Sequence, residues 1–300
     1  MTVELLDGRP VARVLRERAR AELARYSNAY GHVPGLGIVL VGDDPSAGAY
    51  RDAILKAASA VDIPVETRAL PANATQTEIA RVIDEFNARE DIHGFLVLQP
   101  LPPHLSRVEV ADRLDPLKDI DGITTFNAGR LFHGDRDVLA PSTPTGGMAL
   151  LKHYNVPLAG QHAVVLGRSP IVGKPMAALL LAENATVTIC HSRTRELAAY
   201  AREADILVSA VGRPGVVTGD MVKPGATVID FGVNFIDGRM VGDVDADSVA
   251  RVAGRLTPVP GGTGRVTTSV LIRNTNKAAT LQQRRRVGDD VPRARVPGEV

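Results

Sequence analysis

The chain has 300 residues, of which 23% are charged, and a formal net charge of +1 at pH 7. This length suits one large or two medium domains, and the near-neutral charge excludes a field that would favour nucleic acid or a membrane surface. Cys190 is the only cysteine, which excludes an intramolecular disulfide and is typical of the reducing cytosol. No apolar run reaches the length of a membrane span or a signal peptide, so we expect a cytoplasmic protein with no membrane or nucleic-acid partner.

Short, nearly continuous apolar runs alternate with helical patterns along the chain. Such runs are typical of parallel strands that are covered on both faces. The predicted strands cover residues 36–42, 94–99, 162–167, 185–190, 205–212 and 226–232. The predicted helices cover residues 10–27, 46–61, 75–89, 172–183 and 194–203. The alternation predicts an α/β fold with parallel sheets.

A polar segment rich in proline and glycine, residues 131–147, interrupts this alternation and indicates a domain boundary. We expect a first α/β domain over residues 1–140, which a final helix rejoins at 268–285. A second, Rossmann-like domain is expected over residues 141–267. The tail, residues 286–300, has few apolar side chains and is expected to be disordered.

The segment "VVLGRSPIVGKPMAALLLA" follows a predicted strand and opens a predicted helix. Gly167 and Gly173 stand six residues apart, and Ser169 takes the place of the middle glycine of the commonest dinucleotide fingerprint. A tight turn at Gly167 can present backbone N–H groups to a pyrophosphate at the helix N-terminus. The pattern is weak in isolation, and its place between a strand and a helix strengthens it.

The next predicted strand ends in "CHSRT", which contains no carboxylate for a ribose 2′-hydroxyl. His191, Ser192 and Arg193 supply donors and positive charge there, and Arg168 adds a cation in the glycine loop. Such a set suits an acceptor-only 2′-phosphate and favours NADP over NAD. The structural alternative is that His191 and Arg193 are merely solvated at a strand end.

Many further segments occur in a recognisable order, from "PGLGIVLVGDDP", "GFLVLQPLPPHL" and "KDIDGITTFNAGRL" to "ATVTICHSRT", "KPGATVIDFGVN" and "TPVPGGTG". Over about residues 3–279 the chain resembles the bifunctional methylenetetrahydrofolate dehydrogenase/methenyltetrahydrofolate cyclohydrolase family. The resemblance implies a homodimer of two-domain subunits: an N-terminal α/β domain with the folate site and a Rossmann-like NADP-binding domain. It also implies two reactions. Hydride transfer from 5,10-methylene-tetrahydrofolate to NADP is followed by hydrolysis of the methenyl cation to 10-formyl-tetrahydrofolate.

The resemblance assigns roles by matching position. Tyr50 would stack on the aminobenzoyl ring and Asp121 would hydrogen-bond the pterin, so these two are the candidate catalytic residues. The other candidate substrate-binding residues are Leu98, Gln99, Pro100, Pro260, Gly261 and Gly262. The candidate cofactor-binding residues are Gly167, Arg168, Ser169, Val172, Gly173, His191, Ser192, Arg193 and Val233. Without the resemblance, Asp121 is interpreted as a turn residue and Tyr50 as a half-buried helix tyrosine.

The chain departs from the family pattern in three motifs. In the glycine loop, the family's Gly-Gly-Val-Gly-Pro is "GGTGR", with Thr263 and Arg265. The family motif Tyr-Val-x-x-Lys-x-Lys is "YRDAILK" here, so Ile54 replaces the catalytic lysine and Lys56 keeps the second one. The family motif Val-Gln-Leu-Pro-Leu-Pro is "VLQPLP", so Leu98 replaces the glutamine and Gln99 follows it. Because strand side chains alternate, Gln99 is expected to face away unless a bulge intervenes. Replacing both partners with aliphatic residues leaves no stranded buried charge.

Three hypotheses follow. The first is an NADP-dependent methylenetetrahydrofolate dehydrogenase with weak or lost cyclohydrolase activity. The second is a fully bifunctional enzyme in which Lys56 or Gln99 has taken over the missing role. The third is a non-catalytic folate- or nucleotide-binding paralogue, or an oxidoreductase for another pterin-like substrate. Arg265, which lies in the glycine loop of the folate edge, motivates the third; the alternative is that it points to solvent. The histidines show no metal-ligand spacing, so no metal is predicted.

Overall fold

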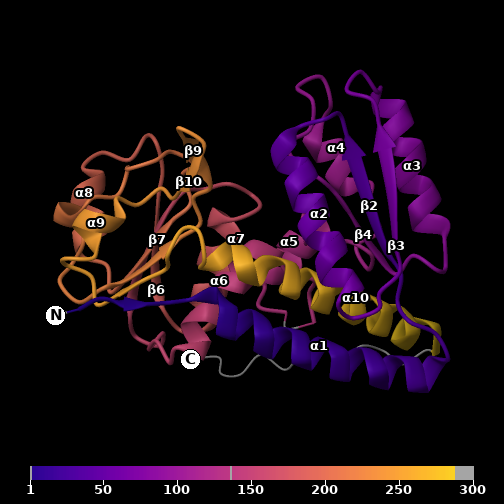
Figure 1. Ribbon diagram of the computed structural model, residues 1–300, viewed down its shortest axis with the longest axis horizontal. Helices are drawn as coiled ribbons and strands as arrows, with labels where there is room; N and C mark the ends of the chain where they lie inside the picture. Colours follow the sequence, from indigo (N-terminus) through magenta and orange to yellow (C-terminus); the bar gives the residue numbers. More distant parts are fainter. Residues whose placement is uncertain (1, 136, 288–300) are drawn as a thin grey trace. The chain divides into compact units, whose positions relative to one another are not determined.

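The computed structural model describes residues 2–135 and 137–287 (Figure 1). The chain divides into two compact units. Unit 1 contains the residues up to Leu15 and Pro141–Val270, and unit 2 contains Arg16–Ala140 and the chain from Leu271 onward. Helices α1 (Gly8–Tyr30) and α10 (Thr263–Val287) each contribute to both units.

Unit 2 contains a three-stranded parallel sheet in the order β3-β2-β4. Its strands are β2 (Leu36–Val41), β3 (Val65–Leu70) and β4 (Gly94–Val97). β2 and β4 are fully buried and were predicted from their apolar runs. β3 was not predicted, because its sequence, "VETRAL", has three consecutive polar residues and so no apolar run. The strand lies at the sheet edge, and none of its residues is buried.

The two faces of this sheet carry separate cores. Leu36, Ile38 and Leu40 point into one cluster, which includes residues of α1, α2 and α10. The alternate residues Val39 and Val41 point into the other, which α3 and α4 cover. The helices that follow α1 in this unit are α2 (Pro45–Ser59), α3 (Gln76–Ala88), α4 (Arg107–Asp112) and α5 (Thr125–Phe132).

Local sequence signals fix where these helices begin. The Asp44 carboxylate accepts hydrogen bonds from the amides of Ser46 and Ala47 at the start of α2. Thr75 and Glu78 form a reciprocal capping box at the start of α3. The α2 helix begins shortly after the carboxyl end of β2, at a start that is marked by local hydrogen bonds.

Unit 1 contains a six-stranded parallel sheet in the order β1-β11-β8-β7-β5-β6. Its strands are β1 (Glu4–Leu5), β5 (His162–Leu166), β6 (Thr186–Cys190), β7 (Ile206–Ser209), β8 (Thr227–Asp230) and β11 (Arg255–Leu256). Ala163 and Val165 pack into the core on one face, and Val164 and Leu166 pack into the core on the other. The two-sided burial explains why the predicted strand is continuously apolar.

The remaining elements of unit 1 lie between these strands. They are α6 (Ser142–His153), α7 (Gly173–Ala182), α8 (Leu197–Arg202), the 3-10 turn η1 (Gly219–Met221), the hairpin strands β9 (Asn234–Ile236) and β10 (Arg239–Val241), and α9 (Ala246–Val249). β9 and β10 pair antiparallel as a separate two-stranded sheet. This hairpin was not predicted from the sequence.

The fold class predicted from the sequence, two-domain α/β with parallel sheets, is confirmed. The two units differ from the predicted domain bounds at the N-terminus, because β1 pairs with β11 and the residues up to Leu15 belong to unit 1. A two-residue strand gives too short an apolar signal to be found from sequence. The predicted tail begins inside a helix, since α10 continues to Val287, and its residues 288–300 lie outside the described residues. Among the described residues, no helix combines the length and apolarity needed to cross a membrane.

Candidate active site

The carboxyl edge of the unit 1 sheet carries the residues predicted to hold a dinucleotide. β5 lies between β6 on one side and β7 on the other, so the chain crosses from β5 to β6 and then returns past β5 to β7. Loops at such a switch point form a crevice beyond the carboxyl ends of the strands, where open α/β sheets bind ligands. The β5–α7 turn and the loops after β6, β7 and β8 meet this edge.

The β5–α7 turn requires its glycines. Gly167 has a φ of 127°, and a Cβ there would lie 2.3 Å from the carbonyl oxygen of Ala210. A Cβ on Gly173 would lie 2.2 Å from the carbonyl oxygen of Gly167. The chain thus folds back on itself tightly, as a turn must if its backbone is to approach a pyrophosphate.

Ser169 completes this turn from the position where the common fingerprint has glycine. Its hydroxyl oxygen accepts hydrogen bonds from the amides of Val172 at 3.1 Å and Gly173 at 3.2 Å. Val172, the N-cap residue of α7, contributes no side-chain cap, so Ser169 performs that task. Arg168 and Ser169 themselves are exposed and can reach a bound anion.

The residues after β6 form a closed turn. The Thr194 hydroxyl accepts the amide of His191 at 2.9 Å, and His191 Nδ1 accepts the amide of Arg193 at 3.1 Å. Ser192 and Arg193 are exposed on this turn. No carboxylate stands between Cys190 and Arg195, so a hydroxyl and a guanidinium face the place that an acidic residue occupies in NAD sites.

The other predicted residues of unit 1 follow β8 and β11. Val233 lies just after β8 and is 58% exposed. Gly261 accepts the amide of Gly8 at 2.8 Å, and a Cβ on Gly8 would lie 2.2 Å from the carbonyl oxygen of Gly262. The loop Pro260–Gly262 is therefore fixed by the segment that enters α1. Arg265, two residues into α10, is exposed, and its charge helps Arg9 to lower the pKa of Asp7.

Unit 2 brings together Ile54 and Leu98, the two positions that the family resemblance assigns to a lysine and a glutamine. Ile54, on α2, is completely buried and Leu98, directly after β4, is 2% exposed. Both belong to the same apolar cluster, against which the half-buried Tyr50 also packs. Hydrocarbon therefore fills the volume beside Tyr50, and neither an amine nor an amide is contributed by these two positions.

Gln99 lies beyond the end of β4, in a bend whose peptide bond to Pro100 is cis. Leu98 continues the strand alternation, because its amide donates to the carbonyl of Val39. The side-chain oxygen of Gln99 is buried and has no hydrogen-bond partner within the described residues. Lys56, two residues beyond Ile54 on α2, is exposed.

Asp121 is half-buried at the end of a segment that is anchored by its neighbours. The buried Lys118 ammonium donates to the carbonyls of Phe86 at 3.0 Å and Asn87 at 2.8 Å, at the end of α3. Asp119 is completely buried and accepts from the amides of Ile123 and Thr124 and from the Asn127 side chain. Burial raises the pKa of Asp119, while these hydrogen bonds oppose the shift.

Lys118 and Asp119 were not identified from the sequence. In "KDIDG" both acidic residues look like turn residues, and only their burial distinguishes the anchoring Asp119 from Asp121. Asp119 holds the loop on one side and Ile120 enters the core on the other, so the orientation of Asp121 is fixed by the residues before it.

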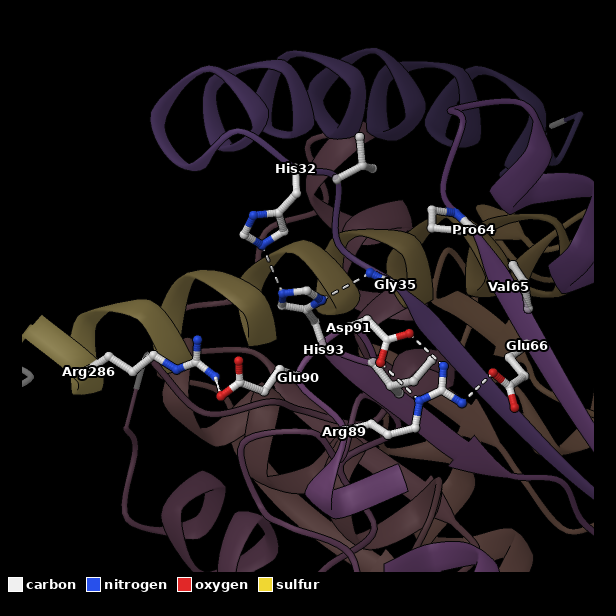
Figure 2. Close-up of a pocket in the computed structure, with 12 residues that line it drawn as sticks. His32, Gly35, Pro64, Val65, Glu66, Arg89, Glu90, Asp91, His93 and Arg286 are labelled. Atoms are coloured by element: carbon white, nitrogen blue, oxygen red, sulfur yellow. Dashed lines mark hydrogen bonds and ion pairs between the residues drawn. The ribbon is translucent and has the colours of Figure 1, made fainter. Parts of the chain in front are cut away.

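A cavity of about 520 Å³ lies at the amino-terminal ends of the unit 2 strands, away from Leu98 and Gln99 at the carboxyl end of β4. Figure 2 shows the residues that line it. None of the predicted site residues lines it. Its centre is His93, whose Nδ1 accepts the Gly35 amide and whose Nε2 lies 3.2 Å from Nε2 of His32. Neutral His93 therefore carries its proton on Nε2 and cannot also offer that atom to a metal ion. Within the described residues no cluster of three or more metal-binding side chains occurs.

Two family models match the chain. The tetrahydrofolate dehydrogenase/cyclohydrolase catalytic domain matches residues 6–121, and the NAD(P)-binding domain of the same family matches residues 141–283. The chain belongs to this family. The chain is thus an enzyme of the tetrahydrofolate dehydrogenase/cyclohydrolase family, and the dinucleotide edge of unit 1 lies in its NAD(P)-binding domain.

Individual relatives agree with this assignment. The chain is 50% identical over 283 residues to the bifunctional protein FolD of Roseiflexus sp. (strain RS-1), covering 94% of this chain and 98% of that protein. The crystal structure of the bifunctional FolD of Campylobacter jejuni matches with a TM-score of 0.90 at 37% identity, over 93% of this chain and 99% of that one. The FolD of Trypanosoma brucei, in a complex with NADP and an inhibitor, matches with a TM-score of 0.89 at 37% identity, over 95% of this chain and 99% of that one.

Proposed function

We propose that the protein is an NADP-dependent 5,10-methylene-tetrahydrofolate dehydrogenase whose cyclohydrolase activity is weak or lost. The observation that carries this proposal is the burial of Ile54 and Leu98 in one apolar cluster beside Tyr50. The family resemblance places a lysine and a glutamine at these positions. Here both positions contribute packing and no proton donor or acceptor.

The two reactions differ in what they require of the protein. Loss of a hydride from the methylene carbon yields the methenyl cation directly, with no proton to remove, and bound NADP supplies the acceptor. The protein has only to hold the two reactants in contact. Hydrolysis adds water to the methenyl carbon and opens the ring, so protons must be removed from one atom and delivered to another. An apolar Ile54–Leu98 pair can support the first reaction and contributes nothing to the second.

The residues proposed to hold the cofactor are those of the unit 1 edge. The exposed Arg168 guanidinium, close to the positive end of the α7 dipole, suits the pyrophosphate. Ser192 and Arg193 suit a 2′-phosphate, because a guanidinium binds phosphate oxygens bidentately and no carboxylate opposes it. Val233, exposed beside this edge, is the proposed apolar neighbour of the nicotinamide.

The test is a pair of assays on one preparation. Oxidation of 5,10-methylene-tetrahydrofolate with NADP should be rapid, and hydrolysis of 5,10-methenyl-tetrahydrofolate should proceed at little more than its rate without enzyme. Enzyme-dependent hydrolysis as fast as the oxidation would contradict the loss. Absence of any NADP-dependent oxidation would contradict the dehydrogenase itself.

The unpartnered side-chain oxygen of Gln99 favours one alternative, a fully bifunctional enzyme. A buried acceptor without a donor is costly in a folded protein and is the kind of group that a bound substrate or water satisfies. If Gln99 or the exposed Lys56 has taken over the proton-transfer role, Gln99→Ala or Lys56→Ala should abolish hydrolysis while oxidation continues. Hydrolysis at an unchanged rate in both variants would reject this alternative.

We also propose that the protein forms a homodimer. The β9–β10 hairpin supports self-association, because Phe235, Ile236 and Met240 are 63%, 48% and 38% exposed. Phe235 and Met240 are paired across the hairpin and so share one face. Light scattering coupled to gel filtration should give twice the chain mass, and Phe235→Glu should give the monomer. A monomeric wild-type protein would reject the proposal.

A further inference from the structure

We infer that Asp243 is a positioning residue for the cofactor, acting through the loops that follow β7 and β8. The inference rests on the proposed cofactor site at the carboxyl edge of unit 1. Asp243 follows the β9–β10 hairpin and is completely buried, and it was not predicted to bind a ligand. Its role is to hold other groups in place.

The Asp243 carboxylate collects five hydrogen-bond donors. One oxygen accepts from three groups and the other from two. The donors are Ser209 Oγ at 3.3 Å, the amides of Val211 at 2.7 Å, Gly212 at 3.1 Å and Arg213 at 3.0 Å, and Asn234 Nδ2 at 3.0 Å. Three consecutive amides that point at one anion form a backbone nest, a geometry that often binds phosphate. Here a side chain of the protein fills the nest permanently.

The nest fixes the loop that supports the glycine turn. Residues 210–213 leave β7 at the switch point, and the Ala210 carbonyl oxygen is the atom that a Cβ on Gly167 would meet at 2.3 Å. The amide of Ala210 donates to Leu166 at 2.8 Å, which joins the loop to the end of β5. A shift of residues 211–213 would therefore move the surface against which the Gly167 turn is packed.

The same carboxylate reaches the other side of the edge through Asn234. Asn234 is the residue after Val233, the proposed neighbour of the nicotinamide. One anion thus connects the loop that supports the pyrophosphate turn with the segment proposed to contact the nicotinamide. A dinucleotide that spans both places depends on their separation, which a shared hydrogen-bond acceptor keeps constant.

A second buried carboxylate holds Asp243 itself. Asp230, at the end of β8, is 2% exposed and accepts the amides of Gly232 at 2.7 Å, Asp243 at 3.1 Å and Val244 at 3.0 Å. A Cβ on Gly242 would lie 1.8 Å from Asp230 Oδ2, so only glycine fits before Asp243. Within the described residues neither carboxylate forms an ion pair, and backbone amides supply most of their partners.

An amide cannot replace the Asp243 carboxylate without loss. Asparagine has the same shape but replaces one oxygen by an NH₂ donor. Whichever oxygen is lost, at least two donors lose their acceptor and then face another donor. The loop after β7 or Asn234 must move to relieve this conflict.

The test compares Asp243→Asn with Asp205→Asn in the full chain. Asp205 precedes β7 at the other end of the same sheet, where it accepts the His162 amide and pairs with Lys223. Both variants remove a carboxylate that binds the backbone, so both should lower the melting temperature. Only Asp243→Asn should weaken NADP binding, by tenfold or more in calorimetry, and raise the KM for NADP while the KM for methylene-tetrahydrofolate stays within twofold.

NADP binding by the wild type and the variants distinguishes a failure of this inference from a failure of the proposed cofactor site. If the wild-type protein binds NADP and the Asp243→Asn variant binds it equally well, this inference alone is overturned. Equal weakening by Asp205→Asn overturns it too, since the effect would then be general destabilisation. Wild-type protein that binds no NADP overturns the proposed cofactor as well. If Asp243→Asn does not fold, Asn234→Ala removes one of the five donors and should weaken NADP binding about threefold; unchanged binding overturns the inference.

Discussion

The dinucleotide edge of unit 1 and the Ile54–Leu98 cluster of unit 2 differ in how they treat buried polar groups. At the first, two buried carboxylates are retained and saturated with donors, five for Asp243 and three for Asp230. At the second, the two positions that the family resemblance assigns to polar side chains hold Ile54 and Leu98, and both side chains are almost fully buried. A buried polar group without partners costs free energy, which favours either a complete set of partners or the replacement of the whole set by apolar side chains.

The difference also separates the two reactions. The polar framework that we propose to position a dinucleotide has its hydrogen-bond partners in place, whereas the pair that the family resemblance assigns to proton transfer is aliphatic here. Hydride transfer should therefore be conserved and hydrolysis reduced. If the apolar cluster, the polar edge and the surrounding scaffold act independently, a substitution in one of them should leave the activity that depends on the others unchanged.

The largest effect is expected from Ile54→Lys. The substitution places an ammonium in a cluster that offers hydrocarbon, and it should lower the free energy of unfolding by about 3–5 kcal/mol. Ala53→Lys, at the exposed neighbouring position on α2, is the matched control and should change it by less than about 0.5 kcal/mol. Urea unfolding measures both.

A double variant, Ile54→Lys with Leu98→Gln, should lose less free energy of unfolding than the sum of the two single losses, because the amide gives the ammonium a partner. Equal stability of Ile54→Lys and wild type would show that the cluster is not a closed apolar core.

A pH effect of intermediate size is expected from His93, in the unit 2 scaffold. Burial, and then the nearby His32, lower its pKa to about 4; Lys118 and Arg286 act in the same direction. Because the folded pKa lies below the ordinary value near 6.5, the unfolded chain takes up the proton first as pH falls. Stability should be complete above about pH 6.5 and decline toward pH 4, by up to about 2 kcal/mol at pH 5. Urea unfolding at pH 7.5 and 5.0 measures the decline, which His93→Asn should reduce. An undiminished decline in that variant would assign it to other groups.

Sequence reasoning found the strands that carry an apolar or β-branched run, including β6, in which only Cys190 is buried. The strands β2, β4, β5 and β8 are buried along their whole length or nearly so, and their apolar runs predict them. The partly exposed β3 and the two-residue β1 leave no such pattern. At the candidate site, the glycine turn and the Ile54 substitution are visible in the sequence. The five donors of Asp243 come from 209–213 and Asn234, separated along the chain, and only the fold brings them together.

A smaller effect, on specificity rather than stability, is expected from Arg193→Ala. If the exposed guanidinium after β6 binds the 2′-phosphate, its loss should raise the KM for NADP about tenfold and leave the KM for NAD unchanged. Arg195→Ala removes another exposed guanidinium two residues further on and is the control. Steady-state rates with each cofactor give the comparison. Parallel increases for NADP and NAD would show that Arg193 does not distinguish them.

The smallest effect is expected from Thr75→Ala, which removes half of the capping box at the start of α3. Both the amide of Glu78 and the Glu78 carboxylate lose a hydrogen-bond partner, so the free energy of unfolding should fall by about 1 kcal/mol. Thr77→Ala changes an exposed threonine within the same turn and should have little effect. Because α3 packs on the sheet face opposite the one that contains Ile54 and Leu98, neither variant should alter the rate of oxidation. A slower oxidation in Thr75→Ala alone would mean that the two faces of the sheet are coupled, and that the apolar cluster responds to a scaffold it does not touch.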